Sequence, residues 1–310
     1  MKHLFTLLAL TIGFSMNAQN QWYSGSGFYS LKTYGNTASA TYSTAMGKNT
    51  TAYQAYSTAM GRDTQASGSN STAMGYTTEA SGTSSTAMGS YATASEDYST
   101  AMGRSTTANG YSSTAMGYET TASGASSTAM GRDTEASGDF STAMGKNTTA
   151  SEDYSTAMGR DTEASGSTST AMGYGTEASG NSSTAMGRDT EASETSSTAM
   201  GGNTSASGYA STAMGNFTTA SGYFSTAMGY NTTASGASST AMGESTTASD
   251  FGSTVIGQYN SSGSTVTNSA ILYNTDNTAF VIGNGANAGS PSDAFKVMFN
   301  GDAYVSSSLY

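Results

Sequence analysis

The chain has 310 residues, of which 35% are hydrophobic and 10% charged, and its formal net charge is −11. The low apolar content excludes a thick globular core, and the negative charge disfavours nucleic acid or anionic lipid as a partner. The sequence has no cysteine and a single histidine, His3, so neither a disulfide framework nor a zinc–thiolate site is expected.

Residues 1–18 have the pattern of a secretory signal peptide. Lys2 and His3 precede an apolar run over residues 4–14, and small or polar residues follow as far as Ala18. The run is too short to cross a bilayer, which needs about 20 apolar residues. The sequence therefore predicts export, with Sec signal cleavage near Ala18 and no membrane-spanning segment in the mature chain.

Residues 19–42 form a lead-in that is richer in aromatic residues than the repeats that follow it. Its large apolar residues are Trp22, Tyr23, Phe28, Tyr29, Leu31 and Tyr34. Atypical residues usually cover the open end of a repeat array. We interpret the segment as an amino-terminal cap, with carbohydrate stacking on the aromatic rings as the alternative.

Residues 43–257 repeat a 14-residue unit without a single insertion. Ser-Thr-Ala-Met-Gly begins at Ser43 and occurs fifteen times at this spacing, and Ser-Thr-Val-Ile-Gly follows at 253–257. The aligned unit is S-T-A-M-G-x-x-T-x-A-S-G-x-x, and we number its positions 1 to 14 from the first serine. A fixed short period is typical of a solenoid with stacked coils. Two short strands and two glycine corners fill the unit, so the predicted fold is an all-β parallel β-roll, or β-solenoid.

Alternation along a strand predicts which side chains face the core. Thr44 and Met46 share one face, and Met is the only large apolar residue in nearly every unit, so we expect that face to be the interior. Thr50 and Ala52 are expected to point inward from the second strand. The predicted core residues are Met46, Met60, Met74, Met88, Met102, Met116, Met130, Met144, Met158, Met172, Met186, Met200, Met214, Met228, Met242 and Ile256.

The alanines at position 3 would then face outward as a strip of small residues. In the first coils this strip consists of Ala45, Ala59, Ala73, Ala87 and Ala101. Burial of one Met is worth about 2 kcal/mol, whereas ordering the backbone of one unit costs about ten times as much. A lone thin solenoid is therefore marginal, and we expect copies of the chain to associate along the alanine strip.

The unit resembles the head repeat of YadA-type trimeric autotransporter adhesins, whose pattern is S-x-A-x-G followed by x-A-x-G or x-A-S-G. Residues 43–47 and Ala52 carry this resemblance, as do their equivalents over about residues 37–257. It implies a left-handed roll, a homotrimer and display at the surface of a Gram-negative-type bacterium. Neither a heptad stalk nor a membrane-barrel pattern follows the repeats, so we expect the anchoring part to be lost or supplied elsewhere.

Variable residues concentrate at the corners of the unit. Tyr76, Tyr118, Tyr174 and Tyr230 at position 6 form the candidate adhesive surface, because exposed tyrosine beside small polar residues suits contact with glycans or matrix proteins. Glu163, Glu177 and Glu191 occupy position 9 of consecutive coils, about 5 Å apart. We interpret them as solvated charges, with a bound cation as the alternative.

Residues 258–310 leave the repeat and form either a cap or a small β module. Apolar strands are expected at residues 270–273, 279–283, 294–299 and 303–305, with a hairpin turn at Asn300-Gly301. The segment looks like the connector that follows such heads in related surface proteins.

Together these features predict a secreted or surface-exposed adhesin head or structural rod. Its partner would be a host or environmental glycan or matrix protein, and no catalytic residue, cofactor or metal is expected. An ice-binding solenoid is one alternative, because threonines such as Thr44 and Thr50 recur in nearly every unit. A polysaccharide-processing solenoid is another, which would need a carboxylate or arginine cluster in a cleft.

Overall fold

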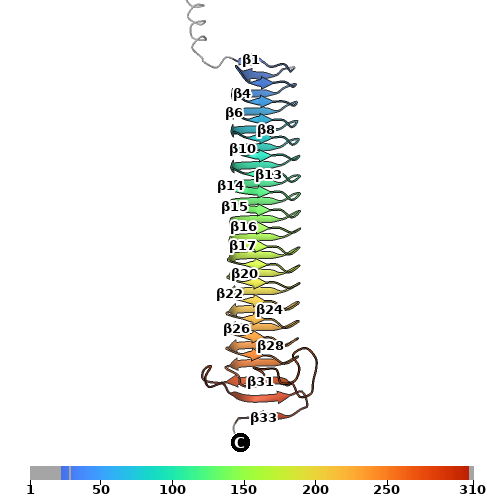
Figure 1. The fold of residues 1–310 in the computed structure, drawn as a ribbon, viewed down its shortest axis with the longest axis vertical. Coiled ribbons are helices and arrows are strands. Elements are labelled where there is room, and N and C mark those ends of the chain that lie inside the picture. The colour runs from blue at the N-terminus through green and yellow to red at the C-terminus, as the bar shows by residue number, and fades with distance from the viewer. Residues whose placement is uncertain (1–21, 28, 307–310) are drawn as a thin grey trace, which may run out of the picture. The chain divides into compact units, whose positions relative to one another are not determined.

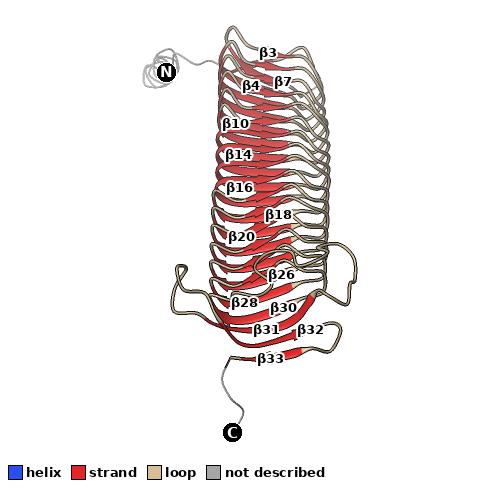
Figure 2. Cartoon of the chain, turned by 60° about the horizontal axis from the view of Figure 1, so that its bottom comes forward, coloured by secondary structure: helices blue, strands red, loops and turns tan. Residues whose placement is uncertain are grey.

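The computed structural model describes residues 22–27 and 29–306, which fall into two units, residues 1–126 and 127–310. Each unit is described by itself. The described residues form strands, turns and loops and no helix (Figure 2). The predicted signal peptide, residues 1–18, lies outside the described residues.

Each repeat contributes one strand at positions 2–6 and a two-residue strand at positions 9–10, and in some coils the two are continuous. The strands of unit 1 are β1 (Trp22–Ser24), β2 (Leu31–Thr33), β3 (Thr37–Ala38), β4 (Thr44–Lys48), β5 (Thr51–Ala52), β6 (Thr58–Arg62), β7 (Gln65–Ala66), β8 (Thr72–Tyr76), β9 (Glu79–Ala80), β10 (Thr86–Ser90), β11 (Thr93–Ala94), β12 (Thr100–Arg104), β13 (Thr107–Ala108) and β14 (Thr114–Ala122).

Unit 2 begins with three continuous strands and returns to the two-strand coil. Its strands are β15 (Thr128–Ala136), β16 (Thr142–Ala150), β17 (Thr156–Ala164), β18 (Thr170–Tyr174), β19 (Glu177–Ala178), β20 (Thr184–Arg188), β21 (Glu191–Ala192), β22 (Thr198–Gly202), β23 (Ser205–Ala206), β24 (Thr212–Asn216), β25 (Thr219–Ala220), β26 (Thr226–Tyr230), β27 (Thr233–Ala234), β28 (Thr240–Glu244), β29 (Thr247–Ala248), β30 (Thr254–Gln258), β31 (Thr278–Asn284), β32 (Asp293–Met298) and β33 (Ala303–Val305).

Strands of successive coils pair in parallel, and equivalent positions lie side by side. Met46 of β4 is the register partner of Met60 in β6, and Glu177 of β19 is the partner of Glu191 in β21. Figure 1 shows this stacking within each unit. A repeat without insertions keeps every coil in the same register. The predicted parallel β-solenoid is confirmed.

The interior of the coils is filled by small side chains from positions 1, 3, 8 and 10. In the first full coil Ser43, Ala45, Thr50 and Ala52 are all at most 1% exposed, whereas Met46 is half-buried on the outer face beside Thr44. The inward direction predicted for Thr50 and Ala52 is correct. The direction predicted for the first strand is inverted.

Two predictions about the first strand are therefore wrong. The methionines do not form the interior, and the position-3 alanines are not an exposed strip. The half-buried residues are Met46, Met60, Met74, Met88, Met102, Met116, Met130, Met144, Met158, Met172, Met186, Met200, Met214, Met228, Met242 and Ile256. The fully buried ones include Ala45, Ala59, Ala73, Ala87 and Ala101. The two strands of so short a coil lie too close for thioether side chains, so methyl and hydroxymethyl groups fill the space.

The two corners of the coil use different residues for their turns. Gly47 at position 5 has φ 127°, as the sequence predicted for that corner. At the other corner the positive φ belongs to position 14, for example 57° at Asn70, and not to Gly68. Gly68 is required for another reason, because a Cβ there would lie 1.9 Å from the carbonyl oxygen of Gly82 in the next coil.

Side-chain amides complete the hydrogen bonding at the amino-terminal end of unit 1. β1 pairs antiparallel with β2, and β2 pairs in parallel with β4. The Asn36 side chain accepts a hydrogen bond from the Thr50 N–H at 2.8 Å and donates one to the Gly47 carbonyl at 2.7 Å. Tyr29 and Tyr34 are 71% and 82% exposed, so these two lead-in rings do not cover the coil. Asn36 and the β1–β2 pair provide the capping contacts instead.

The last repeat coil of unit 2 continues into β31 after a loop. β31 pairs in parallel with β30, and Val281 takes the buried place of Val255. β31, β32 and β33, strands that the sequence predicted, then pair antiparallel. The Met298 N–H and the Asp302 carbonyl close the predicted hairpin between β32 and β33 at 2.9 Å.

The strand predicted at residues 270–273 is wrong. Ile271 and Leu272 lie in an exposed loop, and both of their N–H groups donate to the Ser269 hydroxyl instead of to a neighbouring strand. The loop is held by Asp250, whose fully buried carboxylate accepts hydrogen bonds from the N–H groups of Thr267 and Thr278 at 2.6 and 2.8 Å.

Candidate adhesive surfaces

The outer face of the first strand is a regular surface of threonine and methionine, which we call the Thr–Met face (positions 2 and 4 of every coil). Within each unit these residues are half-buried and lie in register with the same residues of the adjacent coils. In unit 2 the face becomes more apolar after the repeats, since β31 places the half-buried Phe280 and Ile282 beside Thr254 and Ile256. The sequence analysis recognised that these residues share one face but wrongly predicted that this face is the interior.

The four tyrosines of the predicted adhesive surface all lie at the outer corner of their coils. Tyr174 and Tyr230 are 43% and 49% exposed, and Tyr76 and Tyr118 are half-buried. The guanidinium carbons of Arg62, Arg104 and Arg160 lie 4.1, 5.3 and 5.0 Å from the ring centroids of Tyr76, Tyr118 and Tyr174. Each ring therefore belongs to a local cation–π pair or ring pair. Within unit 1, Tyr76 and Tyr118 are three coils apart, and within unit 2, Tyr174 and Tyr230 are four coils apart, so the tyrosines of neither unit form one platform.

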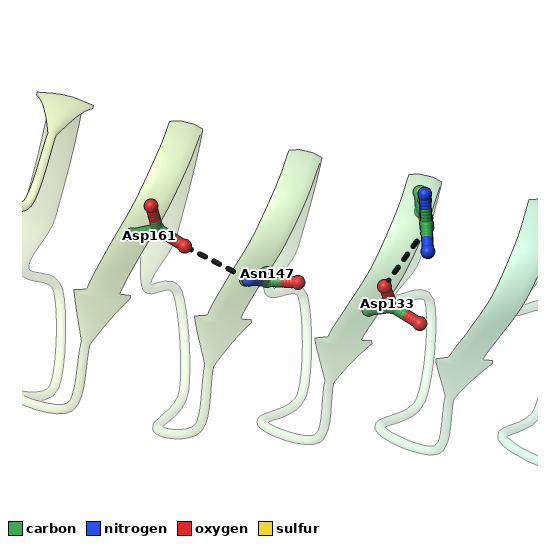
Figure 3. Close-up of polar contacts among 4 residues, drawn as sticks. Asp133, Asn147 and Asp161 are labelled. Carbon is green, nitrogen blue, oxygen red and sulfur yellow. Dashed lines mark hydrogen bonds and ion pairs between the residues drawn. The ribbon is translucent and has the colours of Figure 1, made fainter.

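Position 7 carries polar side chains that bond from coil to coil. Asn147 donates from Nδ2 to Oδ1 of Asp161 in the next coil at 2.8 Å, as Figure 3 shows. Within one coil, Asp133 forms an ion pair with the preceding Arg132 at 3.1 Å. The hydrogen bond from Asn147 lowers the pKa of Asp161 below its ordinary value, and Arg160 contributes in the same direction. These contacts lie at the exposed corner of the coils and favour the ionised form of the Asp161 carboxyl.

Replacing Asn147 by glycine is expected to raise the pKa of Asp161 toward its ordinary value, because the main donor to the carboxylate is removed. Glycine suits the φ of 51° at this position. The pKa of Asp161 is lower in the folded than in the unfolded protein, so the ionised carboxyl stabilises the fold at any pH above the unfolded-state pKa. This stabilisation is lost as the pH falls through the folded-state pKa. On acidification, the free energy of unfolding should therefore fall less in Asn147→Gly than in the wild type.

A carboxyl-carbon NMR titration measures the pKa of Asp161 directly. Asn203→Gly is the matched control, since Asn203 occupies the same position with φ 52° on another coil. An unchanged pKa in Asn147→Gly, or an equal rise in the control, contradicts the assignment.

The glutamates at position 9 form an exposed row on the outer face of the second strand. Glu163 pairs in register with Glu177, and Glu177 with Glu191. Within the described part of the chain, no group of three or more histidine, cysteine, aspartate or glutamate residues is arranged to hold a metal ion. Like charges on neighbouring strands repel one another, which opposes edge-to-edge or face-to-face aggregation.

The corner at positions 13 and 14 carries aromatic clusters that the sequence reasoning did not identify. Tyr29, Tyr42 and Tyr56 stack with centroids 5.3 and 5.1 Å apart. Phe140 and Tyr154 stack at 5.1 Å with an interplanar angle of 5°. The available signal was an aromatic residue at the same position of successive units, which parallel in-register stacking brings face to face.

A hollow of about 380 Å³ lies at this corner near the carboxy-terminal end of unit 2, between Tyr223, Phe224, Phe251 and Ile271. The Ala270 carbonyl accepts a hydrogen bond from the Ala237 N–H at 2.7 Å, which seats the loop of residues 259–277 against the coils. Ile271 and Leu272 are 68% and 71% exposed. Apolar exposure of this kind often marks an interaction surface.

The geometry defines a repeat protein: parallel coils in register, a core of small side chains, and outward rows that differ in chemistry. The sequence matches the YadA head domain repeat in twelve stretches between residues 34 and 260, some of which overlap. The chain therefore belongs to the YadA head repeat family. A comparison with curated proteins returned no match. None of the described residues forms a helix of the length and hydropathy needed to cross a bilayer.

Proposed function

We propose that this chain is the non-enzymatic head of an adhesin, exported and displayed at the surface of a Gram-negative-type bacterium. The observation that carries the proposal is the family match over most of the chain. The geometry supports it, because the exposed residues of the second strand and of the corners vary from coil to coil while the core positions stay constant. A constant scaffold with variable exposed residues is suited to recognition.

We assign self-association to the Thr–Met face. The proposed assembly is a homotrimer, by analogy with the YadA-type trimeric adhesins that the repeat resembles. Its methionines are half-buried in all fifteen coils that carry them, and methionine adapts readily to a facing surface. Association through this face leaves the outward residues of the second strand and both corners available for a partner. The fully buried alanines of position 3 have no part in the interface.

The attachment function is tested with the full chain coupled to beads. The beads are presented to immobilised matrix proteins, to immobilised glycans and to cultured cells, with albumin-coated beads as the reference. We expect attachment to at least one of these surfaces above the reference. Failure to attach to any of them, by protein whose circular dichroism shows an intact β fold, contradicts the proposal.

Ice binding is the second candidate, since the structure places the Thr44 class outward and not in the interior. The threonines are register partners in successive coils, as in the pair of Thr44 and Thr58. A thermal-hysteresis assay separates the two functions. Freezing-point depression by a monomeric protein would favour ice binding, because the face would then be open to water. No thermal hysteresis is expected from the proposed adhesin.

A further inference from the structure

A groove of about 250 Å³ crosses three consecutive coils of unit 1. Besides Thr78, its lining comes from positions 7 and 9 of these coils, namely Asp63, Gln65, Thr77, Glu79, Tyr91 and Thr93. These residues lie on the second strand and the corner before it, not on the Thr–Met face. Self-association through that face therefore leaves the groove open.

The aromatic wall of the groove is held in a fixed orientation. Tyr91 is 51% exposed, and its ring meets the ring of Tyr76 edge to face with centroids 5.3 Å apart. The Arg62 guanidinium covers the Tyr76 ring at 4.1 Å. The contact between the two tyrosine side chains lowers the pKa of Tyr76 and raises the pKa of Tyr91. A rigid aromatic ring provides contact area with little loss of conformational entropy.

The polar wall is rich in hydrogen-bond acceptors. Asp63 accepts a hydrogen bond from Asn49 at 2.8 Å and lies 3.5 Å from Nε of Arg62, which offsets its charge. Gln65 donates from its amide nitrogen to the Ser67 hydroxyl at 2.8 Å, so its carbonyl oxygen is available to accept. The exposed Glu79 adds a second carboxylate. The groove thus combines one flat apolar surface with several oxygen acceptors from three coils.

We propose that this groove binds a pyranose unit of a neutral polysaccharide. The C–H face of the sugar ring packs on Tyr91, and sugar hydroxyls donate to Asp63, Gln65 and Glu79. This inference rests on the proposed adhesin function and names the class of ligand that one site of the protein binds. Ligand-binding sites commonly pair an apolar wall with a few placed polar groups.

A cationic ligand is disfavoured by a second surface on the same protein. In the three coils of residues 155–196 in unit 2, the same two rows carry Asp161, Glu163, Glu177, Asp189 and Glu191 and no aromatic residue. A lysine-rich partner would find more negative charge there than at Asp63 and Glu79. The feature that distinguishes the groove in unit 1 is Tyr91, which favours a ligand with an apolar face.

Native gel electrophoresis in gels containing a neutral β-glucan, mannan or galactan tests the proposal with the full chain. We expect at least one polysaccharide to retard the protein, and Tyr91→Asn and Glu79→Thr each to weaken the retardation about tenfold. Both replacements occur naturally at the same repeat positions, in Asn49 and Thr51, so the coil is expected to keep its fold. Tyr56→Asn, which matches Asn70, removes an exposed aromatic outside the groove and should change nothing.

The inference is overturned if none of the three polysaccharides retards the protein, or if the groove variants are retarded as strongly as the wild type. It is also overturned if poly-L-lysine binds the groove in a Tyr91-dependent manner while the neutral polysaccharides do not. The bead-attachment assay separates this result from the broader proposal. Attachment without polysaccharide retardation overturns the sugar site alone. Tyr91-dependent retardation without attachment to any tested surface supports the site and contradicts the adhesin function.

Discussion

Replacing Gly145 by alanine is expected to destabilise unit 2 by roughly 3–5 kcal/mol, among the largest effects of a single substitution. Gly145 has φ 129°, a conformation that residues with a Cβ rarely adopt. An added Cβ would lie 1.8 Å from the carbonyl oxygen of Gly159 and 2.8 Å from its carbonyl carbon. Because these are backbone atoms of the next coil, the clash cannot be relieved by a rotamer change. The ladder between β16 and β17 must open.

Gly202→Ala is the matched control for this prediction. The nearest atoms to a Cβ at Gly202 are those of the Asn216 side chain, at 3.5 Å or more, and its φ is not positive. Thermal unfolding followed by circular dichroism should show a midpoint roughly 10 °C lower for Gly145→Ala and almost no change for Gly202→Ala. Equal midpoints for the two variants would mean that the coils do not approach as closely as the structure indicates.

The repeat period was enough to predict the architecture because stacking is a consequence of spacing alone. Every unit has the same length, so equivalent residues become register partners, as Thr44 and Thr58 do. The inversion of the first strand has a different origin. The alternation of side chains along a strand shows that Thr44 and Met46 share a face, but it does not show which face is inside. The choice of the larger side chain for the core failed because the separation of the two strands, not hydrophobicity, limits what fits.

The candidate sites were less predictable than the fold. Tyr76 was identified as an exposed tyrosine, but its contacts with Arg62 and Tyr91 depend on which corner residues of adjacent coils turn toward each other. Asp250 occupies a corner position of the repeat, yet its carboxylate is fully buried and holds the loop before β31. Such roles come from the break in the repeat, where no periodicity guides the assignment.

Replacing Met200, Met214 and Met228 together by glutamate is expected to convert the associated protein into monomers. These residues lie on the Thr–Met face of β22, β24 and β26 and are half-exposed, so glutamate of similar length should not disturb the coil interior. Burial of the exposed part of one such methionine contributes roughly 0.5–1 kcal/mol. Burial of an unpaired carboxylate in its place costs several kcal/mol. With three substitutions in each of three chains, mutually repelling carboxylates would have to be buried along one interface.

The control places the same charges on the other face of the same coils. Ser205→Glu, Thr219→Glu and Thr233→Glu change position 9, where Glu163, Glu177 and Glu191 already occur in register. Light scattering coupled to size exclusion should give the trimer mass for this variant and one third of it for the methionine variant, with the β-sheet circular dichroism of both unchanged. A methionine variant that keeps its mass, or a control that loses it, would show that the chains meet through another surface. In that case the methionine row would be expected to bind another molecule, because contact between a row of thioethers and water gives no stabilisation.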